Sequence, residues 1–373
     1  MFLDYARYYL TFGLQLLTAY GVVRGGPWAW LGLSTLFILA VADALLPDDL
    51  AERRITNRTL ANIPVWLCTV SGPALILLLA WSVGQGYLTG ASLVGAIISV
   101  AWMSVIAFVP PSHELYHQRG WLPQFVGTYF QVCYLDCARN IGHTVGHHID
   151  VGTSKDSDTA PRGASLYSFT PNAVVVSTLL SWRIESDALE KRGKGRWSLQ
   201  HRLWKALLAQ LIFHTLAYQL GGWPAVAVCL TSMVIARFWV ESFNYFQHYG
   251  IVRVDGKPVA RRHLWNHLGY FTRPVAFEIT NHADHHLDSY IPYYRLKPDA
   301  AAIRMPNVFL CFLTALMPPV WHHFIIKKAL KEWDLRLASS EERVLARQQN
   351  LAAGWPDWFP ADDQRNAPSV ATA

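Results

Sequence analysis

The chain has 373 residues, of which 52% are hydrophobic and only 16% are charged. Soluble domains carry about 25% charged residues, so the composition argues against an ordinary soluble protein. The formal net charge of +6 requires no nucleic acid partner, because a basic cytoplasmic rim facing anionic lipid accounts for it.

Three long stretches contain no Asp, Glu, Lys or Arg: residues 59–112, 206–236 and 305–326. A bilayer core requires about 20 apolar residues in a helix, whereas buried helices of soluble proteins suit shorter stretches. In chain order we predict membrane spans over 9–24, 28–46, 63–83, 88–109, 204–220 and 223–241. The predicted fold is therefore an all-α integral membrane bundle of six helices with a histidine-rich helical cap in the cytoplasm.

The basic residues of the connecting segments predict the orientation. Arg53, Arg54 and Arg58 follow the second predicted span, whereas residues 84–90 and 221–224 carry no Lys or Arg. By the positive-inside rule, the basic segments and both termini lie on the cytoplasmic side of the cell inner membrane. Five parts follow: 1–110 with four transmembrane helices, 111–203 as a cytoplasmic segment, 204–241 as a transmembrane hairpin, 242–326 as a second cytoplasmic segment, and 327–373 as a cytoplasmic tail.

Two further expectations concern the end of the chain. Residues 305–326 are uncharged, but Pro318 and Pro319 interrupt them and a basic segment follows. A full span there would export that basic segment, so we expect a re-entrant or interfacial stretch. The tail should be helical from Lys327 to about Ala352 and loose beyond.

Nine of the fifteen histidines fall into four tight groups at predicted cytoplasmic positions. Spacings of three and four residues put side chains on one helix face, so such groups can converge on one point. One metal ion cannot use nine imidazoles, whereas two ions with four or five nitrogens each would use all of them. Imidazole suits Zn, Fe, Cu and Ni, so the ligand type does not name the metal. The groups are His113 and His117 in HELYH; His143, His147 and His148 in HTVGHH; His248 in NYFQHYG; and His282, His285 and His286 in HADHH.

Two other functions are compatible with parts of these motifs. HELYH by itself satisfies the H-E-x-x-H pattern of zinc peptidases, which would make His113, Glu114 and His117 an intramembrane protease site. A zinc peptidase needs only one further ligand, which would leave six or seven clustered histidines without a role. A metal transporter would place its ionisable residues near the bilayer midplane, whereas here the histidines lie at one edge.

Acidic residues beside the histidines are candidates to accept the distal ring N–H of a metal ligand. We expect this role for Glu114 and Asp284, which stand between histidines. The other candidates are Asp150, Asp156, Asp158 and Glu278, with Asp156 and Asp158 equally compatible with ordinary solvated acids. His263 and His267 are possible substitute ligands, whereas His201, His214, His322 and His323 lack companions and are expected to be structural.

The boxes HELYH, HTVGHH and HADHH resemble those of the integral-membrane di-iron hydroxylases and desaturases. NYFQHYG is similar to the alkane/xylene monooxygenase family within that group. The runs DSDTAPRG and EITNHADHH are most similar to its branch containing the hydroxylase components of xylene and p-cymene monooxygenases, over about residues 5 to 360. Alkane enzymes usually have Glu where Gln247 stands, which favours the branch that acts on aromatic methyl groups.

This resemblance implies a monooxygenase that uses two iron ions and O2 to hydroxylate the methyl group of xylene, toluene or p-cymene to the benzylic alcohol. A medium-chain alkane is the alternative substrate. The iron ligands would be the nine grouped histidines, and no catalytic side chain beyond the di-iron centre is implied. The chain has no dinucleotide-binding G-x-G-x-x-G after a strand and no four-cysteine run, so electrons must come from another chain. The resemblance implies an NADH-dependent reductase of the ferredoxin or flavin type.

Basic residues of the cytoplasmic segments could dock such an electron donor if its surface is acidic. Solvation and contact with lipid explain these charges equally well. The residues considered are Arg119, Arg139, Arg192, Lys194 and Arg196.

Overall fold

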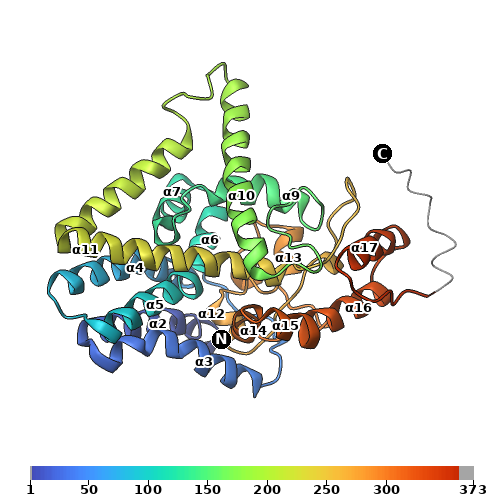
Figure 1. The fold of residues 1–373 in the computed structure, drawn as a ribbon, viewed down its shortest axis with the longest axis horizontal. Helices are drawn as coiled ribbons and strands as arrows, with labels where there is room; N and C mark the ends of the chain where they lie inside the picture. The colour runs from blue at the N-terminus through green and yellow to red at the C-terminus, as the bar shows by residue number, and fades with distance from the viewer. Residues whose placement is uncertain (1, 361–373) are drawn as a thin grey trace.

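The computed structural model describes residues 2–360, and every named element in that range is a helix. A bundle of side-by-side helices forms one end of the molecule (Figure 1). Its members are α2 (Tyr9–Arg24), α3 (Leu31–Ala44), α4 (Arg58–Gly84), α5 (Gly90–Ile106) and the second half of α11 (Arg202–Gln247). The all-helical fold predicted from the sequence is confirmed for the described residues.

Within residues 2–360, four helical stretches are long and apolar enough to cross a membrane: 26–44, 58–84, 90–117 and 202–247. The sequence predicted six spans, and all six predicted segments are helical over most of their length. The difference arises because α2 has only 16 residues and because the last two predicted spans lie on either side of a kink within α11 and are counted as one stretch. A membrane protein follows, whereas six separate crossings stay a prediction.

Glycines make the bend that divides α11. Gly221 and Gly222 lie outside helical geometry, and Gly222 has a φ of 66°. A Cβ at Gly221 would lie 2.7 Å from the carbonyl oxygen of Ala80, and Gly84 of α4 meets the backbone of Leu220. Glycine permits this backbone contact because it has no side chain. The second half of α11 therefore returns along α4 and ends beside His248.

Buried aromatic rings hold the bundle together near its centre. Trp102 of α5 is fully buried and packs edge-on against Trp239 and Phe312, with ring centroids 5.3 and 5.1 Å apart. Phe312 belongs to α14 (Val308–Ala315), which is followed by α15 (Pro318–Val320). Residues 305–326 therefore form short helical pieces against the bundle instead of one long helix.

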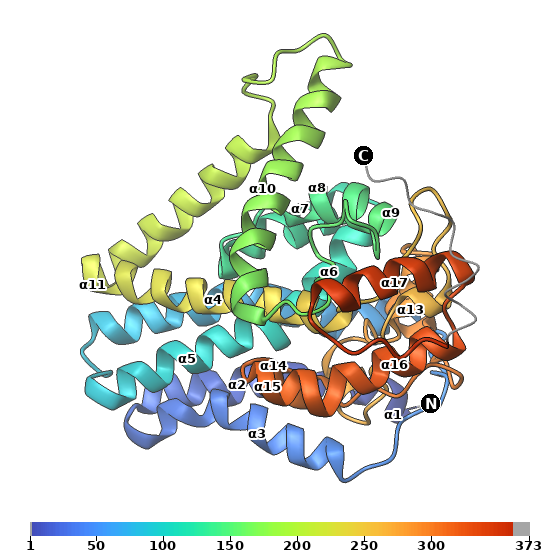
Figure 2. The same ribbon diagram turned by 45° about the vertical axis from the view of Figure 1, so that its right-hand side comes forward.

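A helical hairpin rises from the bundle in both views. It consists of α10 (Leu166–Glu190) and the first half of α11 (Figure 2). A capping box at Ser165 and Ser168 begins α10, which the sequence assigned only to a cytoplasmic segment.

The C-terminal region forms two helices where one was predicted. These are α16 (Lys327–Arg336) and α17 (Ser340–Ala352). The break occurs because Ser339 and Glu342 form a capping box that begins a new helix. Residues 361–373 of the predicted loose end lie outside the described part of the chain.

Short helices between and beyond the bundle helices carry the histidines to one end of the bundle. The histidine-bearing elements are α6 (Val109–His117), the π-helix η3 (His143–His147), α9 (His148–Asp150) and α13 (His282–Leu287). The remaining elements are α1 (Phe2–Ala6), η1 (Gly26–Trp30), α7 (Trp121–Tyr129), η2 (Phe130–Tyr134), α8 (Arg139–Gly142), η4 (Arg261–His263), α12 (Thr272–Val275), η5 (Tyr293–Arg295) and η6 (Trp321–Ile326).

Candidate metal centre

The nine grouped histidines meet at the end of the bundle and divide into two sets. In each set, ligand-capable atoms lie within 4.8 Å of one another. The five-histidine set contains His113, His117, His143, His148 and His285, and the four-histidine set contains His147, His248, His282 and His286. A carboxylate oxygen of Asp158 lies within 4.8 Å of both His143 and His147, so Asp158 adjoins both sets.

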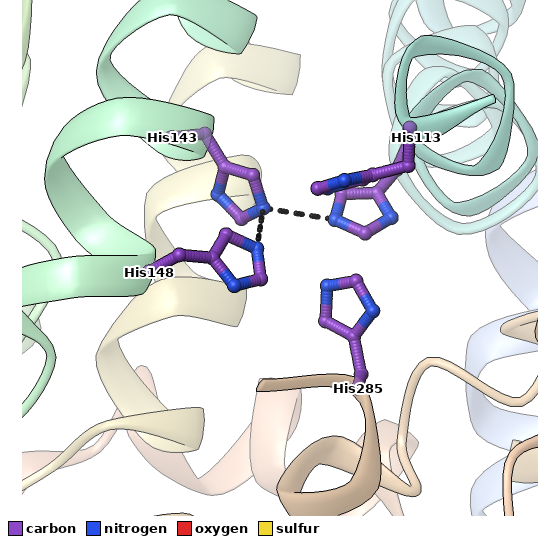
Figure 3. A group of neighbouring side chains, drawn as sticks. His113, His143, His148 and His285 are labelled. Atoms are coloured by element: carbon purple, nitrogen blue, oxygen red, sulfur yellow. Dashed lines mark hydrogen bonds between the residues drawn. The ribbon is translucent and has the colours of Figure 1, made fainter. Parts of the chain in front are cut away.

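The five-histidine set draws its rings from three separate parts of the chain. His113 comes from α6, His143 and His148 from the segment around η3, and His285 from α13, and their rings point toward one another (Figure 3). The Nε2 atom of His143 lies 2.9 Å from that of His113 and 3.1 Å from that of His148. Four nitrogen-bearing rings around one point form a site that suits a metal ion.

A π-helical turn ends at the adjacent histidines His147 and His148, which belong to different sets. Residues 143–147 form a π-helix, in which hydrogen bonds join residues five apart and place them above one another on successive turns. His148 therefore lies next to His143, whereas His147 turns toward His248, with ring centroids 4.4 Å apart. His147 also stacks on His143, with ring centroids 5.1 Å apart, so it lies where the two sets adjoin.

Ring tautomers in the four-histidine set show whether its residues fit a metal ion. Nδ1 of His248 lies 3.1 Å from the carbonyl oxygen of Asn244, and Nδ1 of His282 lies 3.2 Å from that of Ile279. A carbonyl can only accept, so each Nδ1 carries the proton and each Nε2 presents a lone pair. These two Nε2 atoms face each other at 2.6 Å. Two facing lone pairs repel unless a cation lies between or beside them, so these residues fit a metal.

His147 has the same polarity. Both carboxylate oxygens of Asp156 lie 3.0 Å from its Nδ1, and its buried Nε2 has no partner among the described residues. Burial alone would lower the pKa of His147, but the Asp156 carboxylate outweighs burial and raises it. Asp156 therefore orients the ring and increases the basicity of the nitrogen that a metal would use.

Five further grouped histidines outside the apolar helices have lowered pKa values. Burial, reinforced by neighbouring imidazoles, lowers the pKa of His282 to about 3. It lowers the pKa values of His143, His148, His285 and His286 well below their ordinary value. Neutral imidazoles are the form that binds metal.

A buried network of charges lies beside the histidines, and the sequence did not predict it. Arg139 pairs with Asp136 at 2.9 Å, with Glu241 and with Asp158, and Arg237 pairs with the first two of these acids. The Arg139 residue is only 8% exposed, so the suggested role in docking an electron donor is wrong for this residue. Arg237 and Glu241, four residues apart at the end of an apolar stretch, were a sequence signal for this network.

Glu114 and Asp284 do not accept from histidine rings as predicted. Glu114 accepts hydrogen bonds from Gln118 and from the backbone N–H of Tyr293, and Asp284 pairs with Arg261. Both side chains point away from the rings that flank them in the sequence, because neighbours on a helix project in different directions. Among the described residues, Asp156 has the role that was expected of them.

Glu278 also lacks a histidine partner. It is fully buried and accepts from Tyr8, Arg53, Arg273 and Asn281. It has a φ of 57°, and Phe277 before it a φ of 45°. These bonds hold a left-handed turn that leads into α13. Asp150 is another of the predicted acidic candidates, and its backbone carbonyl accepts a hydrogen bond from the Thr153 hydroxyl.

The six remaining histidines lie outside both sets. His263 contacts Glu342 at 2.7 Å and His267 contacts the Pro306 carbonyl at 2.7 Å, so neither substitutes for a grouped histidine. His201 stacks on Trp182, and the other three contact backbone carbonyls. These three are His214, His322 and His323.

Known proteins share this chain's sequence over most of its length. Residues 88–308 match the family model described as fatty acid desaturase, a range that contains all nine grouped histidines. The chain is 39% identical over 366 residues to the xylene/toluene monooxygenase hydroxylase component XylM of Pseudomonas putida, covering 96% of this chain and 98% of that protein.

Alkane monooxygenases are more distant relatives. Alkane 1-monooxygenase 2 of Pseudomonas aeruginosa is 29% identical over 322 residues, which cover 79% of this chain and 82% of that protein. Alkane 1-monooxygenase of Pseudomonas putida is 24% identical over 383 residues, covering 95% and 90%. The family match, the relatives and the clustered histidines agree. The chain is therefore a member of the fatty acid desaturase family, in its group of membrane monooxygenases.

Proposed function

We propose that this chain is the hydroxylase component of a di-iron monooxygenase that converts the methyl group of an alkylbenzene, such as xylene, toluene or p-cymene, to the benzylic alcohol. The observation that carries the proposal is the division of nine histidines, seven of them buried, into sets of five and four in a chain 39% identical to XylM. Two sets with this ligand count suit two metal ions.

In this proposal, the five-histidine set holds one iron ion and the four-histidine set holds the other. Bound iron would supply the O2 activation and the oxidising power that a benzylic C–H bond requires and that side chains lack. Asp158 lies beside both sets, and Asp156 fixes the ring of His147. The protein's own contribution is to hold neutral imidazoles in fixed orientations and to bury them away from water.

The surroundings of the histidines support a hydrophobic substrate that arrives from lipid. The interior of the helix bundle beside the histidines consists of buried aromatic and aliphatic side chains, including Trp102 and Phe108. In the proposed arrangement, six helices cross the inner membrane, both termini lie in the cytoplasm, and the five parts have the boundaries derived from the sequence. The histidines then face the cytoplasm, where an NADH-dependent ferredoxin or flavin reductase can deliver electrons.

A medium-chain alkane remains the second candidate substrate, because relatives at 24–30% identity are alkane 1-monooxygenases. The zinc peptidase alternative is weaker. A peptidase base must face the metal, whereas Glu114 is bonded to Gln118 and Tyr293. His113 and His117 also lie in a set of five histidines, where a peptidase needs fewer.

Metal analysis and a substrate comparison test this proposal. The protein purified from membranes should contain about two iron ions per chain, matching its two ligand sets. With a suitable reductase, NADH and O2, p-cymene, xylene and toluene should give benzylic alcohols faster than octane gives octanol. Alanine at His285 or His248 should abolish hydroxylation. A purified protein that contains one zinc ion per chain, and whose enzymatic activity survives both substitutions, would refute the proposed oxygenase function.

A further inference from the structure

The C-terminal helices touch the two segments that orient the four-histidine set. Helices α16 and α17 and residues 353–360, here called the C-terminal clamp, lie beside α13 in both views (Figures 1 and 2). The clamp is joined to the rest of the protein by two buried charged contacts. Each contact leads to residues adjacent to histidines of the four-histidine set.

The first contact centres on Arg162. Its guanidinium makes a bidentate pair with Asp334 of α16, at 2.6 and 2.7 Å, and donates to Asn350 of α17 at 2.9 Å. Both charged side chains are fully buried. Arg162 also donates through Nε to the carbonyl of Gly250 at 2.8 Å. One side chain therefore links both clamp helices to the segment that follows His248.

The loop that carries Asp156 ends near Arg162 and is hydrogen-bonded to the segment that follows His248. The N–H of Gly250 donates to the carbonyl of Ala160 at 2.8 Å, two residues before Arg162. The same loop holds the Asp156 carboxylate against His147. The Arg162 contact thus connects the clamp to the surroundings of both His147 and His248.

The second contact centres on Glu342 of α17, which is 2% exposed. It accepts two hydrogen bonds from Arg262 at 3.0 Å and lies 2.7 Å from His263. Burial opposes ionisation of this carboxyl, but the hydrogen bonds from His263 and Arg262 outweigh it and lower its pKa to about 2. Glu342 is therefore a fixed anion at neutral pH.

Residues next to this second contact hold α13. Arg261 pairs with Asp284, and the side-chain oxygen of Asn266 accepts from the backbone N–H of Ala283 at 3.1 Å. Asp284 and Ala283 lie between His282 and His285. The Glu342 contact therefore reaches the helix that supplies His282 and His286 of the four-histidine set, together with His285 of the other set.

The clamp has no comparable contact with the elements that supply most of the five-histidine set. Across residues 2–360, no hydrogen bond or ion pair joins residues 327–360 to α6 or to residues 139–150. Four of the five histidines come from those elements. The contacts are therefore concentrated on one half of the metal centre.

We propose that the C-terminal clamp positions the four-histidine set, with Arg162 and Glu342 as its positioning residues, and that loosening it releases metal from this set before the other. The inference rests on the proposed two-iron function. Partners that orient metal ligands typically change metal affinity by about 10- to 100-fold when they are removed. A scaffold element without this role would instead lower the melting temperature and leave the metal content unchanged.

Glu342→Gln is the first test, because the amide keeps the volume and one acceptor while the charge is lost. Glu341→Gln is its matched control, since the neighbouring acid is exposed and pairs only weakly with Lys257 at 3.7 Å. Iron per chain is measured on the folded, monodisperse protein after dialysis against a weak chelator. We expect Glu342→Gln to lose about half of its iron, with affinity reduced about tenfold, and the control to match the wild type.

The double variant Arg162→Met/Asp334→Leu is the second test. It removes the Arg162 contact without leaving an unpaired buried charge, so its folding should be preserved. Glu332→Gln, which affects only the exposed pair of α16 with Arg336, is the control. We expect the double variant to lose the same half of the iron. If this variant does not fold, the Glu342→Gln result decides.

His248→Ala identifies the set that loses metal. If the clamp acts on the four-histidine set, adding Glu342→Gln to His248→Ala should remove no further iron, because both changes affect one site. Full iron content in the folded clamp variants, or equal loss of iron from both sets, would overturn the proposed positioning role of the C-terminal clamp. A wild-type protein with a single zinc ion would instead overturn the proposed function.

Discussion

Replacing Asp156 by Asn should weaken metal binding at the four-histidine set without unfolding the protein. Asp156 is buried, and its carboxylate contacts Nδ1 of His147 and accepts from Thr159 at 2.6 Å. The amide has the same shape. Its oxygen can still accept from His147, and its NH2 group can donate to the Thr159 hydroxyl, so the substitution removes mainly the negative charge.

The size of the effect follows from that single change. A hydrogen bond to a charged group contributes about 1.5–3 kcal/mol and a neutral one about 0.5–1.5 kcal/mol, a difference of about 1–1.5 kcal/mol. This difference corresponds to roughly a tenfold loss of iron affinity. His147 becomes a weaker ligand because it loses the carboxylate that increases its basicity.

Anaerobic titration of the iron-free protein with Fe(II) measures this affinity. The same carboxylate raises the pKa of His147, so protons compete with metal more strongly in the wild type than in the variant. Titration at about pH 8 suppresses that competition, because metal binding requires the neutral ring. Asp255→Asn is the matched control. Asp255 is exposed and pairs at 2.9 Å with Lys155, which precedes Asp156 in the loop.

Two results would refute the reasoning. Equal Fe(II) affinity in Asp156→Asn and the wild type would mean that the carboxylate does not influence the ligand. A similar loss in Asp255→Asn would mean that loop charge, and not contact with His147, determines the affinity.

Three further outcomes concern stability. Glu342 has a pKa of about 2 in the folded protein, against 4.5 ordinarily. Its contribution to the free energy of unfolding should therefore be complete above pH 4.5 and fall as the pH drops toward 2. This contribution should vanish in Glu342→Gln when unfolding is followed by circular dichroism. Gly221→Ala should lower the melting temperature through its clash with the Ala80 carbonyl, at a cost of about 1–3 kcal/mol, whereas Gly13→Ala, in open space, should not. Glu278→Gln should destabilise by about 3 kcal/mol because buried arginines lose their counter-charge, and an unchanged melting temperature would contradict this.

The helical membrane class and the histidine groups were predictable from the sequence because both are local properties. Charge-free stretches predicted the apolar helices, and spacings of three and four residues predicted histidines that share helix faces. The predicted spans 204–220 and 223–241 also meet at the observed bend, where Gly221 and Gly222 adopt backbone geometry that other residues avoid. The capping box at Ser339 could have been read in the same way, and it divides the predicted C-terminal helix.

The division of the histidines required the tertiary structure. His147 and His148 are adjacent in the sequence yet belong to different sets, because neighbouring residues of a helix project in different directions and meet rings from different parts of the chain. The acids beside the histidines in sequence, Glu114 and Asp284, bond elsewhere, while Asp156 arrives from a loop. Side-chain direction depends on local helix geometry, which the pattern of residue types does not encode.

Long-range charge pairing was likewise decided by packing. Arg162 and Asp334 are 172 residues apart and pair only because two helices and two loops pack around them. A sequence shows which residues carry charge, but burial and partner choice depend on the free energy of the whole packed arrangement. The sequence by itself determined which side chains are available for metal chemistry, and the tertiary structure determined which of them meet.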